Sequence, residues 1–217
     1  MQKLTINFGK IDPFLFFDQN NVADDETARF LNTVFVHNPM LDAGGDIGAD
    51  AYGFTPGIRV AYANESNKGL PWGVSAGVFG ADTGAHYTDS LSRPTMLLQA
   101  EVSPLLALGL RGNYRIYVWQ NGRATPFANE FDLQRETHRG VGISVDQRVH
   151  DAVTVFARLG SSSKGQQRFE RATTIGVDIG GNYWGRAADG LGIAIAHLPA
   201  SPDFRAVSAT LDADADA

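Results

Sequence analysis

Residues 106–119 read LALGLRGNYRIYVW, and this stretch decides the fold. Apolar side chains stand at every second position, namely Leu106, Leu108, Leu110, Tyr114, Ile116 and Val118. The positions between them carry Arg111, Asn113, Arg115, Tyr117 and Trp119. A period of two is typical of a β-strand whose two faces meet different surroundings. The stretch therefore predicts a strand with one apolar face and one charged, aromatic face.

The same alternation recurs along the chain. Met96 and Leu98 alternate with Gln99 and Glu101, and residues 153–159 and 173–186 repeat the pattern. Further candidate strands are 4–8, 54–63, 72–80, 139–146, 191–198 and 204–211. Helical periodicity is rare, so these segments predict an all-β chain of about ten strands.

The predicted connections alternate between long and short. Long connections are expected at 80–93, 120–138 and 161–168, and short ones at 103–105, 147–151 and 187–190. A meander with its long loops at one end is typical of an outer-membrane barrel, whereas a Greek-key sandwich has no reason to sort its loops. We interpret residues 1–217 as one domain, with 18–53 forming a loop that contains a short helix, capped by Asp24 or Asp25.

Composition excludes several classes of protein. The chain has 217 residues, 24 glycines, no cysteine and a net charge of −6. No apolar run approaches the ~18 residues that a membrane-spanning helix needs. Lysine and arginine are scattered singly, so nucleic acid is not expected as a partner. The start lacks the pattern of a secretory signal, and the end dissolves into an acidic tail at Asp212, Asp214 and Asp216. We read both ends as truncations of something longer.

The polar faces carry charge and the apolar faces do not. Arg111, Arg115, Arg158, Glu170, Asp178 and Arg186 fall on the polar faces, beside Tyr117, Phe156 and Trp184. A lipid-facing surface must be free of charge, because Arg or Lys at the bilayer midplane costs about 2–4 kcal/mol. Tyr62, Trp72 and Tyr183 lie near the ends of apolar faces, where either an aromatic girdle or ordinary edge aromatics would stand. The pattern favours a transmembrane β-barrel with a polar lumen.

Arginine with tryptophan suits a sugar, which offers hydroxyl groups in its ring plane and C–H groups above and below. The alternative is that the arginines form structural ion pairs with Glu101, Glu170 and Asp178 inside a narrow barrel. Both arrangements are compatible with one pore.

An ordered set of segments points to a known family. It consists of Gly9-Lys10-Ile11-Asp12-Pro13, Phe17-Asp18-Gln19-Asn20, Phe30-Leu31-Asn32, Asn113-Tyr114-Arg115, Val118-Trp119, Gly142-Ile143-Ser144-Val145-Asp146-Gln147, Phe156-Ala157-Arg158-Leu159-Gly160, and Gly181, Trp184, Arg186, Asp189, Gly190 and Leu191-Gly192. Over nearly its whole length the chain resembles the carbohydrate-selective outer-membrane porins of Gram-negative bacteria, the OprB type.

The resemblance implies an antiparallel transmembrane barrel of about sixteen strands that admits glucose and similar sugars by passive diffusion through the outer membrane. It places Arg115, Arg158 and Arg186 in the lumen. Alternation alone adds Arg111, Glu101, Trp119, Asp178 and Trp184 to the expected pore lining. With about ten strands, the chain corresponds to the central and later part of such a porin, and its sheet edges would be open.

A few other features of the sequence suggest alternative functions. A soluble all-β carbohydrate-binding module, with its apolar faces packed on each other, is the main alternative. Asp82-Thr83-Gly84 is similar to an aspartic-protease loop, but that catalyst needs two such loops. Asp46 and Asp50 only partly match a calcium loop, and the five histidines show no metal-ligand spacing. We expect no enzyme activity, metal or cofactor; sugars and outer-membrane lipid are the expected partners, and the oligomeric state is left open.

Overall fold

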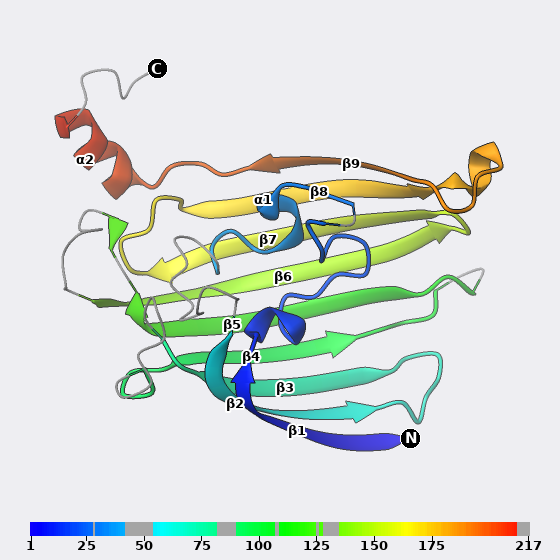
Figure 1. Ribbon diagram of the computed structural model, residues 1–217, viewed down its shortest axis with the longest axis horizontal. Coiled ribbons are helices and arrows are strands. Elements are labelled where there is room, and N and C mark those ends of the chain that lie inside the picture. Colours follow the sequence, from blue (N-terminus) through cyan, green and yellow to red (C-terminus); the bar gives the residue numbers. More distant parts are fainter. Residues whose placement is uncertain are drawn as a thin grey trace.

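The computed structural model describes residues 1–27, 29–41, 54–81, 90–106, 109–124, 126–127 and 135–211. They form one antiparallel sheet whose nine strands follow one another in chain order from β1 to β9. The strands are β1 (Gln2–Ile11), β2 (Thr55–Asn64), β3 (Trp72–Phe79), β4 (Thr95–Val102), β5 (Gly112–Ala124), β6 (Glu136–His150), β7 (Val153–Lys164), β8 (Arg171–Gly180) and β9 (Gly190–His197). Figure 1 shows this meander, with β1 and β9 at its two edges. The prediction of an all-β antiparallel chain is confirmed.

Two predicted strands are corrected. Residues 204–211 belong to helix α2 (Pro202–Leu211), not to a strand. Phe204, Val207 and Leu211 are three and four residues apart, which is the spacing of a helix and not of a strand. The Ser201 hydroxyl accepts the amide N–H of Phe204 at 3.0 Å, which starts the helix. The described sheet therefore has nine strands where the sequence suggests about ten.

The strand predicted over 106–119 begins only at Gly112. The residues before it close a turn, in which Leu105 bridges to Arg111 and the amide of Leu106 donates to the carbonyl of Leu110 at 2.9 Å. Gly109 has a φ of 73°, a left-handed conformation that favours glycine. The alternation of the sequence therefore continues through a turn, although the strand itself does not.

The connections are sorted by length, as expected, over most of the sheet. One end of the sheet carries the connections 12–54, 80–94, 125–135 and 165–170, and the other carries 65–71, 103–111, 151–152 and 181–189. We call these ends the long-connection end and the short-turn end. Only the last pair reverses the order, because the 3-10 helix η4 (Gly181–Trp184) lengthens the connection from β8 to β9.

The sheet is curved and its two faces differ. The convex face carries an apolar belt, whose exposed members include Leu4, Ile6, Ile58, Val60, Val74, Leu98, Ile116, Val118, Val155, Ile175, Ile193 and Ile195. The concave face carries glycines and polar residues at the alternate positions, and the strand register keeps each face continuous from β1 to β9. No helix in the described part of the chain is long and apolar enough to cross a membrane.

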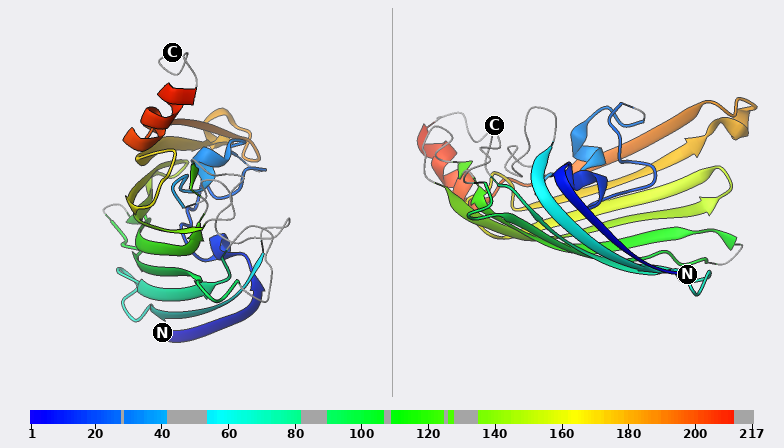
Figure 2. Two further views of the ribbon diagram at one scale, coloured as in Figure 1. Left: turned by 90° about the vertical axis from the view of Figure 1, so that its left-hand side faces the viewer. Right: turned by 60° about the horizontal axis from the view of Figure 1, so that its bottom comes forward.

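Residues 12–27 and 29–41, which belong to the connection after β1, lie on the concave face, and we call them the inserted segment. Figures 1 and 2 show this segment in front of the middle strands, inside the curve of the sheet. It contains the 3-10 helix η1 (Pro13–Leu15) and helix α1 (Thr33–Val36). Asn32 caps α1, accepting the amide N–H of Val34. The expected caps are therefore wrong, and Asp25 instead caps a turn by accepting the amide N–H of Thr27.

Apolar side chains of the inserted segment pack on the few apolar residues of the concave face. Phe17 contacts Phe79 edge-to-face with ring centroids 5.9 Å apart, and Phe30 contacts Phe156 at 5.2 Å. Glycines on the strands make room for this close approach. A Cβ added to Gly160 would lie 2.2 Å from the Oδ1 of Asn38. The segment therefore rests directly on the backbone of the sheet.

Candidate functional site: a buried polar network under the inserted segment

One row of the strand register supplies the polar concave residues. Glu101 on β4 pairs with Arg115 on β5, which pairs with Ser144 on β6, and Ser144 in turn pairs with Arg158 on β7. Neighbouring strands are about 4.8 Å apart, so the two arginines lie about 10 Å from each other across the sheet. The alternation predicted from the sequence thus places both arginines on the same face and at the same height.

Arg158 and Asp18 form the centre of the network. Arg158 donates from Nε to Asp18 Oδ1 at 3.2 Å and from Nη2 to the Asp18 carbonyl at 3.0 Å. Its Nη1 donates to the carbonyl of Phe35 at 2.6 Å. Both side chains are at most 1% exposed. One guanidinium of the sheet therefore binds two separate parts of the inserted segment.

The carboxylate of Asp18 is further satisfied by neutral groups. It accepts the Tyr117 hydroxyl at 2.9 Å and the amide N–H of Asn38 at 2.6 Å. Asn38 Nδ2 donates to the Tyr117 oxygen at 2.7 Å, and the amide of Asp18 donates to Gln99 Oε1 at 3.1 Å. Asp18 itself has a φ of 57°, which is uncommon for a residue other than glycine. Its left-handed backbone is held by bonds to β4, β5 and β7.

A second network, centred on Asp146 of β6, holds the next residues of the segment. Asp146 accepts Asn113 Nδ2 at 2.6 Å, Arg115 Nη1 at 3.0 Å and the amide N–H of Asn21 at 3.3 Å. The Ser144 hydroxyl donates to the carbonyl of Gln19 at 2.8 Å. Arg115 is also 3.6 Å from Glu101. These contacts fix residues 19–21 beside the first network.

The later part of the segment is held by β8. Arg29 forms an ion pair with Asp178, and the Thr174 hydroxyl donates to the carbonyl of Val34 at 3.2 Å. Residues 18–38 therefore have polar contacts with β4, β5, β6, β7 and β8. The inserted segment is a fixed part of the concave surface.

Burial raises the pKa of two carboxyl groups in the segment. Burial raises the pKa of Asp24 above its ordinary value, and the nearby Arg158 opposes this shift. Burial likewise raises the pKa of Asp12, against the hydrogen bond that its carboxylate accepts from the amide of Phe14. Desolvation is the dominant cause in both groups.

The structure places five of the predicted lining residues on the concave face and three elsewhere. Glu101, Arg115, Trp119, Arg158 and Asp178 are on the concave face. Arg111, Trp184 and Arg186 are not, because the strands that should carry them start at Gly112 or end at Gly180. Arg186 is 74% exposed and pairs with Asp189 at 2.9 Å in the β8–β9 turn, while Arg111 donates to the carbonyls of Ser103 and Lys68.

The expected ion pairs are partly formed. Arg115 lies near Glu101, as the structural alternative anticipates, but its shorter contact is with Asp146. Asp178 pairs with Arg29, and Glu170 pairs with its neighbour Arg171 at 3.3 Å. Sequence reasoning missed Asp18 and Asp146 as the carboxylates that meet the arginines. Both stand inside the segments that carry the family resemblance, which was the available signal.

Arg59 of β2 is a further concave-face residue that sequence reasoning missed. Its guanidinium stacks over the ring of Phe16 at 4.6 Å, and its Nη1 donates to Asn7 Oδ1 at 3.3 Å. Its Nε is buried and has no hydrogen-bond partner among the residues that the structure describes. Glu101 nearby is 39% exposed. Unlike Arg158, these two side chains keep polar groups that are not fully used by the protein.

Several sequence hypotheses fall outside the described residues. These are the protease-like loop Asp82-Thr83-Gly84, the calcium-loop candidates Asp46 and Asp50, and the acidic tail at Asp212, Asp214 and Asp216. Within the described ranges, His, Asp and Glu side chains nowhere gather in a group of three that could hold a metal ion.

Comparison with known proteins adds to this geometry. A family model described as carbohydrate-selective porin, OprB family, matches residues 1–216. The high-pH structure of Pseudomonas putida OprB superposes with a TM-score of 0.73 at 19% sequence identity, covering 98% of this chain and 55% of that one. The chain thus spans about half the length of that protein and shares its fold. No curated protein matches the chain.

Proposed function

The chain belongs to the OprB family of carbohydrate-selective porins, and on that premise we propose that its sheet is the wall of a passive channel for sugars in a Gram-negative outer membrane. The observation that carries the proposal is the division of the sheet into an apolar convex face and a polar concave face. In a porin the first meets lipid and the second lines the lumen. Members of the family are channels, and we assign the chain no catalytic reaction or cofactor.

The direction of the apolar side chains argues against the soluble binding module. In such a module, the apolar faces of two sheets would pack on each other. Here Ile193 and Ile195 are 58% and 67% exposed on the convex face, and the described residues supply no second sheet to cover them. A lipid environment removes the cost of this exposure, because acyl chains replace water against the apolar belt.

We propose that the inserted segment narrows the lumen. It stands on the concave face and is held there by the Asp18 and Asp146 networks. Arg158 is covered by the segment, so its proposed role is to position the segment and not to touch a passing solute. Arg115 has the same role for residues 19–21. Trp119 and Asp178, which are also buried, belong to this supporting wall.

Among the described charged residues of the concave face, we propose that Arg59 and Glu101 are the groups that meet a solute. A guanidinium donates and a carboxylate accepts, so together they match the hydroxyl groups of a pyranose such as glucose. Phe16, which stacks on Arg59, adds an aromatic ring next to them. The binding must be weak, because a channel needs its solute to leave as readily as it enters.

Reconstitution in liposomes tests the proposal. We expect glucose to enter faster than a disaccharide and faster than an amino acid of similar size, as swelling rates measure. Glu101→Gln should reduce the preference for glucose, while the control Arg186→Gln, at the short-turn end, should leave it unchanged. Equal swelling with all three solutes would overturn sugar selectivity. A protein that stays dispersed without detergent and gives no swelling would favour the binding module.

A further inference from the structure

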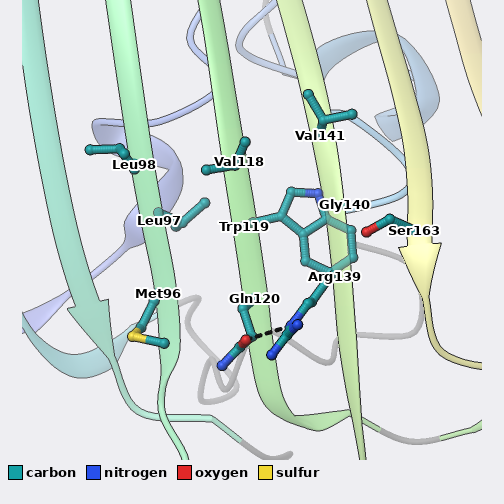
Figure 3. Close-up of a pocket in the computed structure, with 10 residues that line it drawn as sticks. All are labelled: Met96, Leu97, Leu98, Val118, Trp119, Gln120, Arg139, Gly140, Val141 and Ser163. Atoms are coloured by element: carbon teal, nitrogen blue, oxygen red, sulfur yellow. Dashed lines mark hydrogen bonds between the residues drawn. The ribbon is translucent and has the colours of Figure 1, made fainter.

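The convex face has a groove with a basic end, which lies at the long-connection end of the sheet. It has a volume of about 410 Å³ and lies between β4, β5 and β6. Its sides are formed by the outward side chains of Met96, Leu98, Val118 and Val141, and its end by Gln120 and Arg139. Figure 3 shows the groove with Arg139 and Gln120 joined by a hydrogen bond at one end of the apolar residues.

Two neighbouring basic residues lie at this end of the groove. Arg139 of β6 and Lys164 of β7 are register partners, and both are exposed. Residues paired in this way on one face have their Cβ atoms about 5 Å apart. Arg171 of β8 lies one strand further and is balanced by Glu170 at 3.3 Å. Arg139 Nε donates to Gln120 Oε1 at 2.6 Å, and its two terminal amino groups have no hydrogen-bond partner within the described ranges.

The absence of acidic partners distinguishes this end from the other. Across the part of the chain that the structure describes, no carboxylate forms an ion pair with Arg139 or Lys164. At the short-turn end, Arg148 pairs with Asp151 at 3.4 Å and Arg186 with Asp189 at 2.9 Å. Cations directly above an apolar belt, without a protein counter-ion, are complementary to the anionic head group of an amphiphile.

We propose that this groove binds a membrane lipid with a phosphate-bearing, anionic head group. The phosphate accepts hydrogen bonds from Arg139 and Lys164, and one acyl chain lies between Leu98 and Val118. The site rests on the proposed function, since it requires the convex face to be in a bilayer. Long connections of such barrels are extracellular, so the lipid belongs to the outer leaflet.

A second groove supplies a contrast. It is lined by Val155, Ile175, Val177, Ile193, Ala194 and Ile195, together with Phe156 and Gly176, and has a volume of about 420 Å³. No charged residue stands among its lining residues, so it can accept acyl chains but has nothing to select a head group. The pairing of an apolar groove with two uncompensated cations is what marks the first groove.

Native mass spectrometry of the protein, purified in mild detergent, tests the site. We expect phosphatidylglycerol to bind more tightly than phosphatidylcholine with the same acyl chains. The double variant Arg139→Gln/Lys164→Gln should weaken phosphatidylglycerol binding by about thirtyfold, the loss that removing two cations near an anionic lipid surface implies. The control Arg148→Gln/Arg186→Gln removes the same charge at the other end and should change binding by less than about twofold.

The acyl part of the site has its own variant. Val118→Phe should fill the groove and weaken lipid binding while both cations remain. Equal losses in the two double variants, or no loss in either, would overturn the proposal. Displacement of the lipid by millimolar inorganic phosphate would show a phosphate site and not a lipid site. Swelling with glucose should be the same in wild type and Arg139→Gln/Lys164→Gln, which separates this test from that of the channel.

Discussion

Replacing Arg158 by methionine should release the inserted segment from the concave face. The change removes three hydrogen bonds, to Asp18 Oδ1, to the Asp18 carbonyl and to the Phe35 carbonyl. It also removes the cation that forms an ion pair with Asp18, whose side chain is fully buried. Breaking a buried ion pair from one side costs about 3–5 kcal/mol.

This free energy is a change in the equilibrium between the docked and the released segment. Every 1.4 kcal/mol is about a factor of ten, so the population of the released state should rise on the order of a hundredfold to a thousandfold. We expect faster limited proteolysis within residues 12–41 and a smaller difference between the swelling rates for glucose and a disaccharide, since the channel is wider.

A double-mutant cycle shows whether the pair is the cause. The double variant Asp18→Asn/Arg158→Met should be less damaged than the sum of the single variants, with a coupling of about 1–3 kcal/mol. Arg186→Met is the control, because Arg186 is mostly exposed and surface ion pairs contribute about 0–1 kcal/mol. If Arg158→Met and Arg186→Met have the same proteolysis rate and size discrimination, Arg158 does not hold the segment.

Three other predictions concern single positions. Gly160→Ala should lower the thermal unfolding temperature and speed proteolysis of the segment, because its Cβ would overlap Asn38 and overpacking costs about 1–3 kcal/mol. If neither the unfolding temperature nor the proteolysis rate changed, the segment would not be packed tightly against the sheet. Ile116→Arg, on the convex face, should lower the free energy of folding into bilayers by about 2–4 kcal/mol in urea titrations, whereas an effect no larger than that of Ile116→Ala would argue against lipid contact. Because burial raises the pKa of Asp24, its neutral form stabilises the fold below its ordinary pKa near 3.8, and this contribution is lost as pH rises through the raised pKa. Urea stability measured against pH should show that decline. Asp24→Asn should reduce it and leave the part that comes from Asp12, whose pKa is also raised; a decline of the same size in Asp24→Asn would refute the assignment.

The sequence was sufficient to predict those parts of the fold that depend on the alternation of neighbouring residues along a strand. Alternation over 96–102 and 153–159 assigned each side chain to a face, because a strand turns successive side chains to opposite sides. The strand register then confirms that Arg115 and Arg158 share the concave face. The family was likewise recognisable from short segments in a fixed order.

Alternation failed where it crossed an element boundary. It continued through the turn at Gly109 and past the end of β8, and so placed Arg111 and Arg186 on strands that do not include them. The partner of Arg158 could not be deduced either, because Asp18 is 140 positions away and its contact depends on how the inserted segment folds back. Local patterns carry no information about such a contact.

The long sequence separation of these contacts also constrains the order of assembly. Residues 18–38 bind to polar groups of β4 to β8. This binding surface is therefore incomplete until β7, which carries Arg158, has joined the sheet. Contacts between residues this far apart in sequence stabilise the fold only after the entropy cost of closing the intervening loop has been met. The segment is synthesised before β4 to β8, so it must wait for these strands to pair before it reaches its final position.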